Sequence, residues 1–104
     1  TGAGRREMAA VDFHSAAAAA LAVGGAELLD ARGGRQQSMV VRYRLDGRRY
    51  ECVCDAQMRI IDAGVCLTSD ETGERGDSYF TLESLPAVIR QADREGVLVV
   101  YRHV

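Results

Sequence analysis

The sequence predicts an α+β domain in which two helices pack on one face of a mainly antiparallel sheet. Two helical patterns, one early and one late in the chain, and several short runs of alternating or apolar residues predict this class. The predicted order is α-β-β-β-β-α-β, and the 104 residues fit one domain.

The first helix is predicted over residues 7–23. Apolar side chains recur there at three- and four-residue spacing, as at Ala9, Phe13 and Leu21. Alanine, the strongest helix former, fills much of the segment, and Gly24-Gly25 is typical of a helix end. Residues 1–6 are expected to be a flexible N-terminal segment or a remnant of cloning, and residues 7–104 to be the single domain.

A β-hairpin is predicted over residues 38–55, around the dipeptide Asp46-Gly47. Runs of alternating residues flank this dipeptide, which suits a two-residue type I′ turn. That loop length sets a register in which Tyr43 faces Tyr50. One face of the hairpin then carries Met39, Val41, Tyr43, Tyr50, Cys52 and Cys54, as a core face should. The opposite face carries Arg42, Arg44, Arg49 and Glu51.

Three further strands are predicted. A short one covers residues 27–31 and another covers residues 59–66. The last covers residues 97–104, and its apolar run on both faces predicts a central strand. A right-handed parallel crossover through the second helix is one connection that fits this order.

The second helix is predicted over residues 82–95. Thr81 is the expected N-cap, Pro86 lies in the first turns, and Gly96 follows as the stop. Residues 67–79 before it form a polar, glycine-containing loop.

Composition limits the classes of partner. The formal net charge is −2, so the whole chain has no general attraction to nucleic acid or to acidic membranes. All 13 basic residues are arginines. A GC-rich genome explains this, and the alternative is selection for bidentate recognition of carboxylate or phosphate. The three cysteines are an odd number and cannot all pair within one chain, and no apolar segment resembles a signal peptide. Both observations favour a reducing, cytoplasmic setting in a bacterial protein.

The outer hairpin face is the first candidate site. Its binding residues are Arg42, Arg44, Arg48, Arg49 and Glu51. Clustered arginines suit a phosphate backbone or an acidic peptide, and a partner would relieve the opposition of Arg44 and Arg49. The alternative is a solvated face on which Glu51 neutralises Arg42. No aromatic side chain interleaves with these arginines, so stacking on nucleic-acid bases is not supported.

An acidic loop is the second candidate. Its carboxylates are Asp70, Glu71, Glu74 and Asp77. Such a cluster could bind Ca²⁺, but the EF-hand spacing is absent because the twelfth position from Asp70 is Thr81. A solvated acidic loop is the favoured interpretation, and loops of this length are often functional.

The cysteines are interpreted as core residues. Cys52 and Cys54 share one face of a strand, and a free cysteine packs well as a small apolar side chain. A structural zinc site would need four ligands, which Cys66 and His14 or His103 would have to complete. We therefore expect no metal and no cofactor.

The leading hypothesis is a small non-catalytic interaction module, either free-standing or part of a larger bacterial protein, because no catalytic motif is recognised. Its partner would be another protein or a second copy of itself, and the edge of the first strand is one surface for this. No membrane partner is expected. A nucleic-acid-binding domain that uses the arginine face is the alternative hypothesis, and a small enzyme or metal-binding protein is the second alternative.

Overall fold

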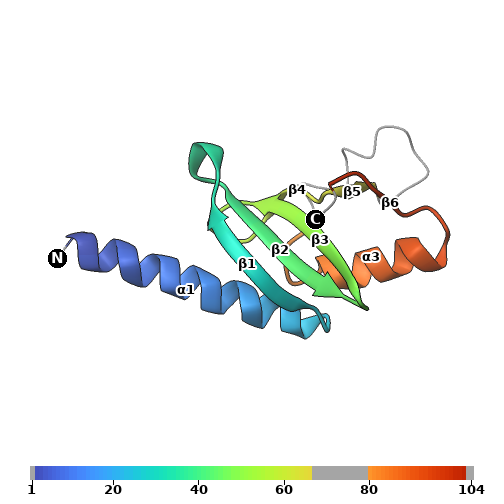
Figure 1. Cartoon of the computed structure of the whole chain (residues 1–104), viewed down its shortest axis with the longest axis horizontal. Coiled ribbons are helices and arrows are strands. Elements are labelled where there is room, and N and C mark those ends of the chain that lie inside the picture. The colour runs from blue at the N-terminus through green and yellow to red at the C-terminus, as the bar shows by residue number, and fades with distance from the viewer. Residues whose placement is uncertain (1, 67–79, 103–104) are drawn as a thin grey trace.

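The computed structural model describes residues 2–66 and 80–102, and it describes the side chains of the first helix from Asp12 onward (Figure 1). The elements are α1 (Gly2–Val23), β1 (Glu27–Gly33), the one-turn 3₁₀ helix η1 (Arg35–Gln37), β2 (Met39–Leu45), β3 (Arg48–Cys54), β4 (Ile60–Asp62), β5 (Val65–Cys66), α3 (Leu85–Arg94) and β6 (Val99–Val100). The α+β class and the predicted order are confirmed.

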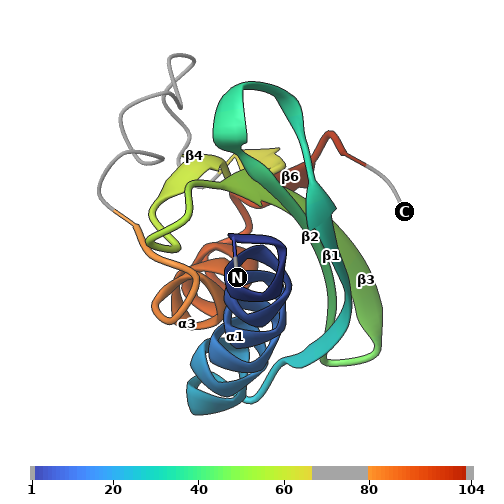
Figure 2. The ribbon, with the colours of Figure 1, turned by 90° about the vertical axis from the view of Figure 1, so that its left-hand side faces the viewer.

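The sheet is antiparallel and has the strand order β1-β2-β3-β4. Figure 2 shows that it curves around α1 and α3, so both helices lie on its concave face, as predicted. Between these layers lies the core. Its members include Leu21 of α1, Leu85 and Ile89 of α3, and Val41, Tyr43, Leu45, Tyr50, Cys52 and Cys54 of the sheet.

The hairpin has the predicted turn and register. Asp46 and Gly47 have φ angles of 51° and 82°, as a type I′ turn requires. Every predicted pair between β2 and β3 is observed, including Tyr43 opposite Tyr50, whose ring centroids are 5.5 Å apart. Arg90 of α3 holds the turn, because its Nε and Nη2 donate hydrogen bonds of 2.9 and 3.0 Å to the Asp46 carboxylate. Its Nη1 donates to the Gly24 carbonyl at the end of α1.

Both predicted helix starts change. The helix α1 begins at Gly2 rather than at Glu7. The helix α3 begins at Leu85 rather than at Leu82, because Thr81 and Ser84 hydrogen-bond each other across a separate turn and Pro86 has no N–H to bond residue 82.

The strand predicted over 59–66 is divided into β4 and β5 at Gly64, whose φ of +78° bends the chain there. This position has no space for a side chain, since a Cβ on Gly64 would clash with the carbonyl oxygen of Glu51. The carbonyl of Gly64 also accepts hydrogen bonds of 3.1 Å from the N–H groups of Tyr101 and Arg102. Gly64 therefore fixes the C-terminal segment against β3.

The central strand predicted over 97–104 is wrong. Of the described residues 97–102, only Val99–Val100 form a strand, β6, and it pairs antiparallel with β5 in a separate small sheet. The described strands therefore contain no parallel crossover. Val99 is 58% exposed, so the apolar run is not buried on both faces. Beyond β6 the regular ladder gives way to the hydrogen bonds that Tyr101 and Arg102 both donate to Gly64, and no apolar pattern encodes them.

We expect Gly64→Ala to lower the free energy of unfolding by about 2–4 kcal/mol, because the new Cβ adds a backbone clash to an unfavourable positive φ. Gly96→Ala is the matched control. Gly96 has a similar φ of +74° with nothing within 4 Å of a Cβ, so its replacement should cost only about 1 kcal/mol. Urea denaturation of both variants measures the difference, and equal losses would contradict the clash.

At Tyr43 we expect a substitution to raise the free energy of unfolding rather than to lower it. Its ring is fully buried, and its hydroxyl has no hydrogen-bond partner among the residues that the structure describes. Burial, with smaller contributions from Cys52 and Tyr50, raises the pKa of this phenol far above its ordinary value. We expect Tyr43→Phe to raise the free energy of unfolding by about 1 kcal/mol, because it removes an unpaired polar group. Loss of stability in the same urea assay would show that the hydroxyl is satisfied.

Candidate functional site

The hairpin register brings most of the predicted arginine face together. Arg42, Arg44, Arg49 and Glu51 share the outer face of the sheet, which is the face turned away from the helices. Arg48 does not join them. It pairs with Leu45 on the helix side, and its Nη1 lies 3.7 Å from the carboxylate of Asp93 in α3.

Glu51 is the centre of an ion-pair network on this face. Arg42 donates from Nε to Oε1 at 3.0 Å, and Arg102 donates from Nη2 and Nε to Oε2 at 2.8 and 3.1 Å. Arg102 also reaches Asp62, with Nη1 3.4 Å from Oδ2. The Glu51 side chain is only 12% exposed. The hydrogen bond from Arg42 and those from Arg102 hold the pKa of Glu51 below its ordinary value, although burial acts in the opposite direction.

The outer face is therefore largely charge-compensated. Arg44 lies 3.8 Å from Glu27 of β1 in a second, looser ion pair. Within the described residues, Arg49 alone of the four predicted face arginines in β2 and β3 has no ion pair. Arg102, which sequence reasoning did not place here, supplies the cation that completes the network. Its contribution depends on the docking of the C-terminal segment at Gly64, and no local pattern reveals this.

The second predicted site, Asp70, Glu71, Glu74 and Asp77, lies outside the described residues. The cysteines of β3 are placed as predicted, since Cys52 and Cys54 are fully buried free thiols. Burial raises the pKa of the Cys54 thiol to about 11, and it raises that of Cys52 further. Among the residues that the structure describes, no three metal-ligating side chains lie close enough to share an ion.

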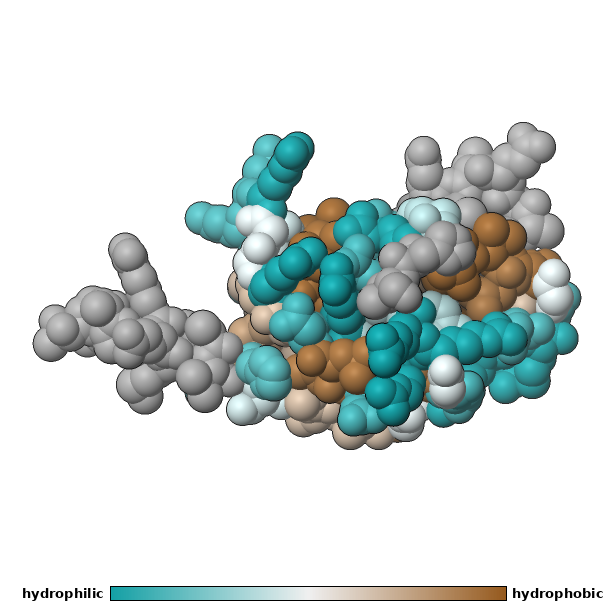
Figure 3. Space-filling model, viewed as in Figure 1, coloured by the Kyte–Doolittle hydropathy of each residue, from teal (hydrophilic) through white to brown (hydrophobic). Residues whose placement is uncertain are grey.

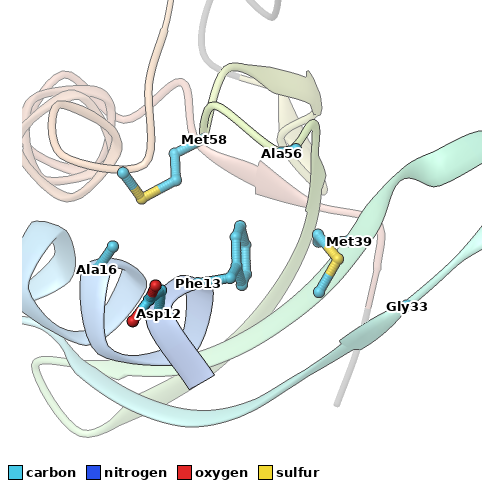
Figure 4. Close-up of a pocket in the computed structure, with 7 residues that line it drawn as sticks. All are labelled: Asp12, Phe13, Ala16, Gly33, Met39, Ala56 and Met58. Atoms are coloured by element: carbon cyan, nitrogen blue, oxygen red, sulfur yellow. The ribbon is translucent and has the colours of Figure 1, made fainter. Parts of the chain in front are cut away.

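An apolar pocket lies where α1 passes the ends of β1 and β2, and sequence reasoning missed it. It has a volume of about 660 Å³ and is lined by Asp12, Phe13, Ala16, Gly33, Met39, Ala56 and Met58. Figure 4 shows the ring of Phe13 in the middle of this space, with Met39 on one side and Met58 on another. The size falls in the range of ligand-binding pockets.

Met58 enters the pocket from a strained turn. Its φ is 64°, in the left-handed region that costs an ordinary residue about 1 kcal/mol. Asp55 holds this conformation, because its Oδ1 accepts 2.9 Å hydrogen bonds from the N–H groups of Gln57 and Arg59. Arg59 also donates from Nε to Asp55 Oδ2 at 2.8 Å. The turn thus presents a methionine where glycine would be the relaxed choice.

One carboxylate lines the pocket, and a hydrophilic turn connects two of the other lining residues. Asp12 is exposed and has no ion pair among the described residues. The helix η1, which connects the pocket residues Gly33 and Met39, projects from the sheet as a hydrophilic spur (Figures 1 and 3). Its Gln36 and Gln37 are exposed at positive φ angles of 53° and 62°. The pocket is thus apolar inside, with the Asp12 carboxylate at its rim.

Comparison with protein-family models, with curated proteins and with solved structures found no significant match. Among the described residues, no helix combines the length and the hydropathy needed to cross a membrane.

The Glu51 network predicts a pH dependence of stability. Its pKa in the folded chain lies below the ordinary 4.5. The stabilisation is thus fully present above about pH 4.5 and is lost as the pH falls through the lower folded value. We expect Glu51→Gln to cost about 1 kcal/mol at pH 7 and progressively less in acid.

Glu27→Gln is the control for this prediction, since Glu27 is 68% exposed and only loosely paired. Its cost should stay under about 0.5 kcal/mol. Urea denaturation between pH 3 and pH 7 measures both variants. A Glu51→Gln deficit that does not shrink in acid would contradict the role of the carboxylate.

Proposed function

We propose that this chain is a non-catalytic interaction module that binds an apolar segment of a partner protein in the pocket between α1, β2 and the β3–β4 turn. The observation that carries the proposal is the accessible apolar wall formed by Phe13, Met39 and Met58. Methionine and phenylalanine adapt to different partner side chains, and methionine is over-used at adaptable binding surfaces.

The strained turn at Met58 supports the same function. A left-handed residue with a long side chain persists only where the surrounding structure stabilises it, and such residues gather at functional sites. Here the Asp55 hydrogen bonds supply the stabilisation and the pocket gains a flexible thioether wall. Glycine in this turn would remove the strain but would also remove the wall.

The margin of the pocket defines the chemistry of the partner. The interior suits one or two large apolar side chains, since it offers mainly carbon and sulfur atoms. Asp12 at the rim suits a neighbouring arginine or lysine of the partner. The partner segment is therefore apolar with an adjacent basic residue, and we propose that the encounter takes place in the bacterial cytoplasm. The free thiols of Cys52 and Cys54 support a reducing compartment.

Nucleic-acid binding through the arginine face is the weaker proposal on this geometry. Arg42 is engaged by Glu51, and Arg48 lies on the helix side beside Asp93. A phosphate backbone would have to compete with these carboxylates. Arg49 and the loosely paired Arg44 leave few cations for the counterion release on which such binding depends.

Selection of peptides from a random library tests the proposal. We expect selected peptides to combine large apolar residues with an adjacent Arg or Lys, and Met58→Gly to weaken their binding by about tenfold or more. The free energy of unfolding of Met58→Gly should stay within about 1 kcal/mol of wild type, because relief of the positive φ offsets the lost packing.

Ile61→Ser is the matched control, because Ile61 is an apolar residue of β4 that is 55% exposed and does not line the pocket. It should bind the peptides as wild type does. Isothermal titration calorimetry measures the affinities and urea denaturation the stabilities. The pocket proposal fails if the selected peptides bind Met58→Gly as tightly as wild type.

A further inference from the structure

The free edge of the sheet is at β1. This strand of seven residues pairs with β2 on one side, and no described residue pairs with it on the other (Figure 1). The opposite edge at β4 is covered, since Ile60 donates its N–H to the Phe80 carbonyl and Arg59 bridges to Thr81. An uncovered edge is a template for pairing with another strand.

A β-bulge leaves only part of this edge regular. The register of β1 against β2 shifts between Leu28 and Asp30, and from Asp30 to Gly33 the pairing is continuous. Bulges blunt an edge against indiscriminate pairing. The regular edge that remains for a partner strand is therefore short, from Asp30 to Gly33.

This segment carries two exposed side chains of opposite charge. Asp30 and Arg32 are both exposed, and they lie two residues apart on the outer face of the sheet. Neither has an ion pair among the described residues, although Asp30 lies opposite Arg42 in the register, because Arg42 is turned to Glu51. An incoming strand with the opposite charges at these positions would pair with both.

We propose that β1 pairs antiparallel with β1 of a second copy of this chain, about a twofold axis at Ala31. A symmetric antiparallel pair has its axis on one residue, which then faces itself. An axis at Asp30 would oppose two carboxylates, and an axis at Arg32 would oppose two guanidinium groups. Only the axis at Ala31 places Asp30 of each copy opposite Arg32 of the other.

The pairing joins the two four-stranded sheets into one continuous sheet. Because it involves a short segment, it belongs with the small, transient interfaces, and association will depend on concentration. It shares with the pocket only Gly33 at the end of the strand. The dimer and the proposed peptide binding can therefore fail separately.

Charge exchange tests the register. Analytical ultracentrifugation should show concentration-dependent dimers of the wild-type chain. Asp30→Arg and Arg32→Asp should each weaken dimerisation by about tenfold or more, because each opposes like charges twice across the axis. The double variant Asp30→Arg with Arg32→Asp should recover the wild-type association. Glu83→Arg, which changes an exposed charge outside β1, should have no effect.

Cross-linking tests the axis. In an antiparallel pair, directly opposed Cα atoms lie about 4.5–5.5 Å apart, within reach of a disulfide. Ala31→Cys should therefore form a covalent dimer under mild oxidation. Gly33→Cys should not, because it lies two positions from the axis on each strand and faces Leu29 of the other copy. A wild-type chain that stays monomeric at high concentration would overturn the proposal, as would single charge variants that dimerise like wild type.

Discussion

A two-residue turn with both residues at positive φ is the constraint on which the rest of the structure depends. Asp46 and Gly47 set the register of β2 against β3. Since side chains alternate along a strand, this one choice decides which residues enter the core and which form the outer face. Arg90 connects the turn to the end of α1, so the hairpin, α1 and α3 meet at one guanidinium group. A slip by one residue would exchange the two faces.

The hairpin was predictable because its determinants are local. Alternation and the Asp46-Gly47 dipeptide suffice to assign Tyr43 and Cys52 to the core. The ion pair of Glu51 with Arg42 follows from the same register. The second ion pair of Glu51, with Arg102, does not follow from it. Arg102 is 51 positions away, and Gly64 brings it there through backbone hydrogen bonds that no side-chain pattern records. The apolar run near residue 99 wrongly predicted a central strand for the same reason, because side-chain periodicity does not show which backbone groups pair.

The pocket was not predictable because its walls come from three separate segments. The sequence predicts Phe13 as a core residue of a helix and Met39 as a core-face residue of the hairpin, and neither pattern indicates a pocket. The decisive residue is Met58, whose left-handed conformation results from the hydrogen bonds of Asp55. Sequence reasoning instead favoured the outer arginines, because clustered like charges are visible in a sequence. Glu51 is visible from the hairpin register, but the carboxylates of Glu27 beside Arg44 and of Asp93 beside Arg48 are recognised only in three dimensions.

The burial of Cys52 and Cys54 gives this chain an internal reporter of its own motions. A thiol reacts as the thiolate, and burial keeps both of these groups protonated and out of reach of reagents. Alkylation at β3 therefore has to wait for an opening that separates the strand from the helices. The rate at which a reagent modifies these two side chains therefore measures the free energy of that opening in the native state, and no label has to be introduced into the chain.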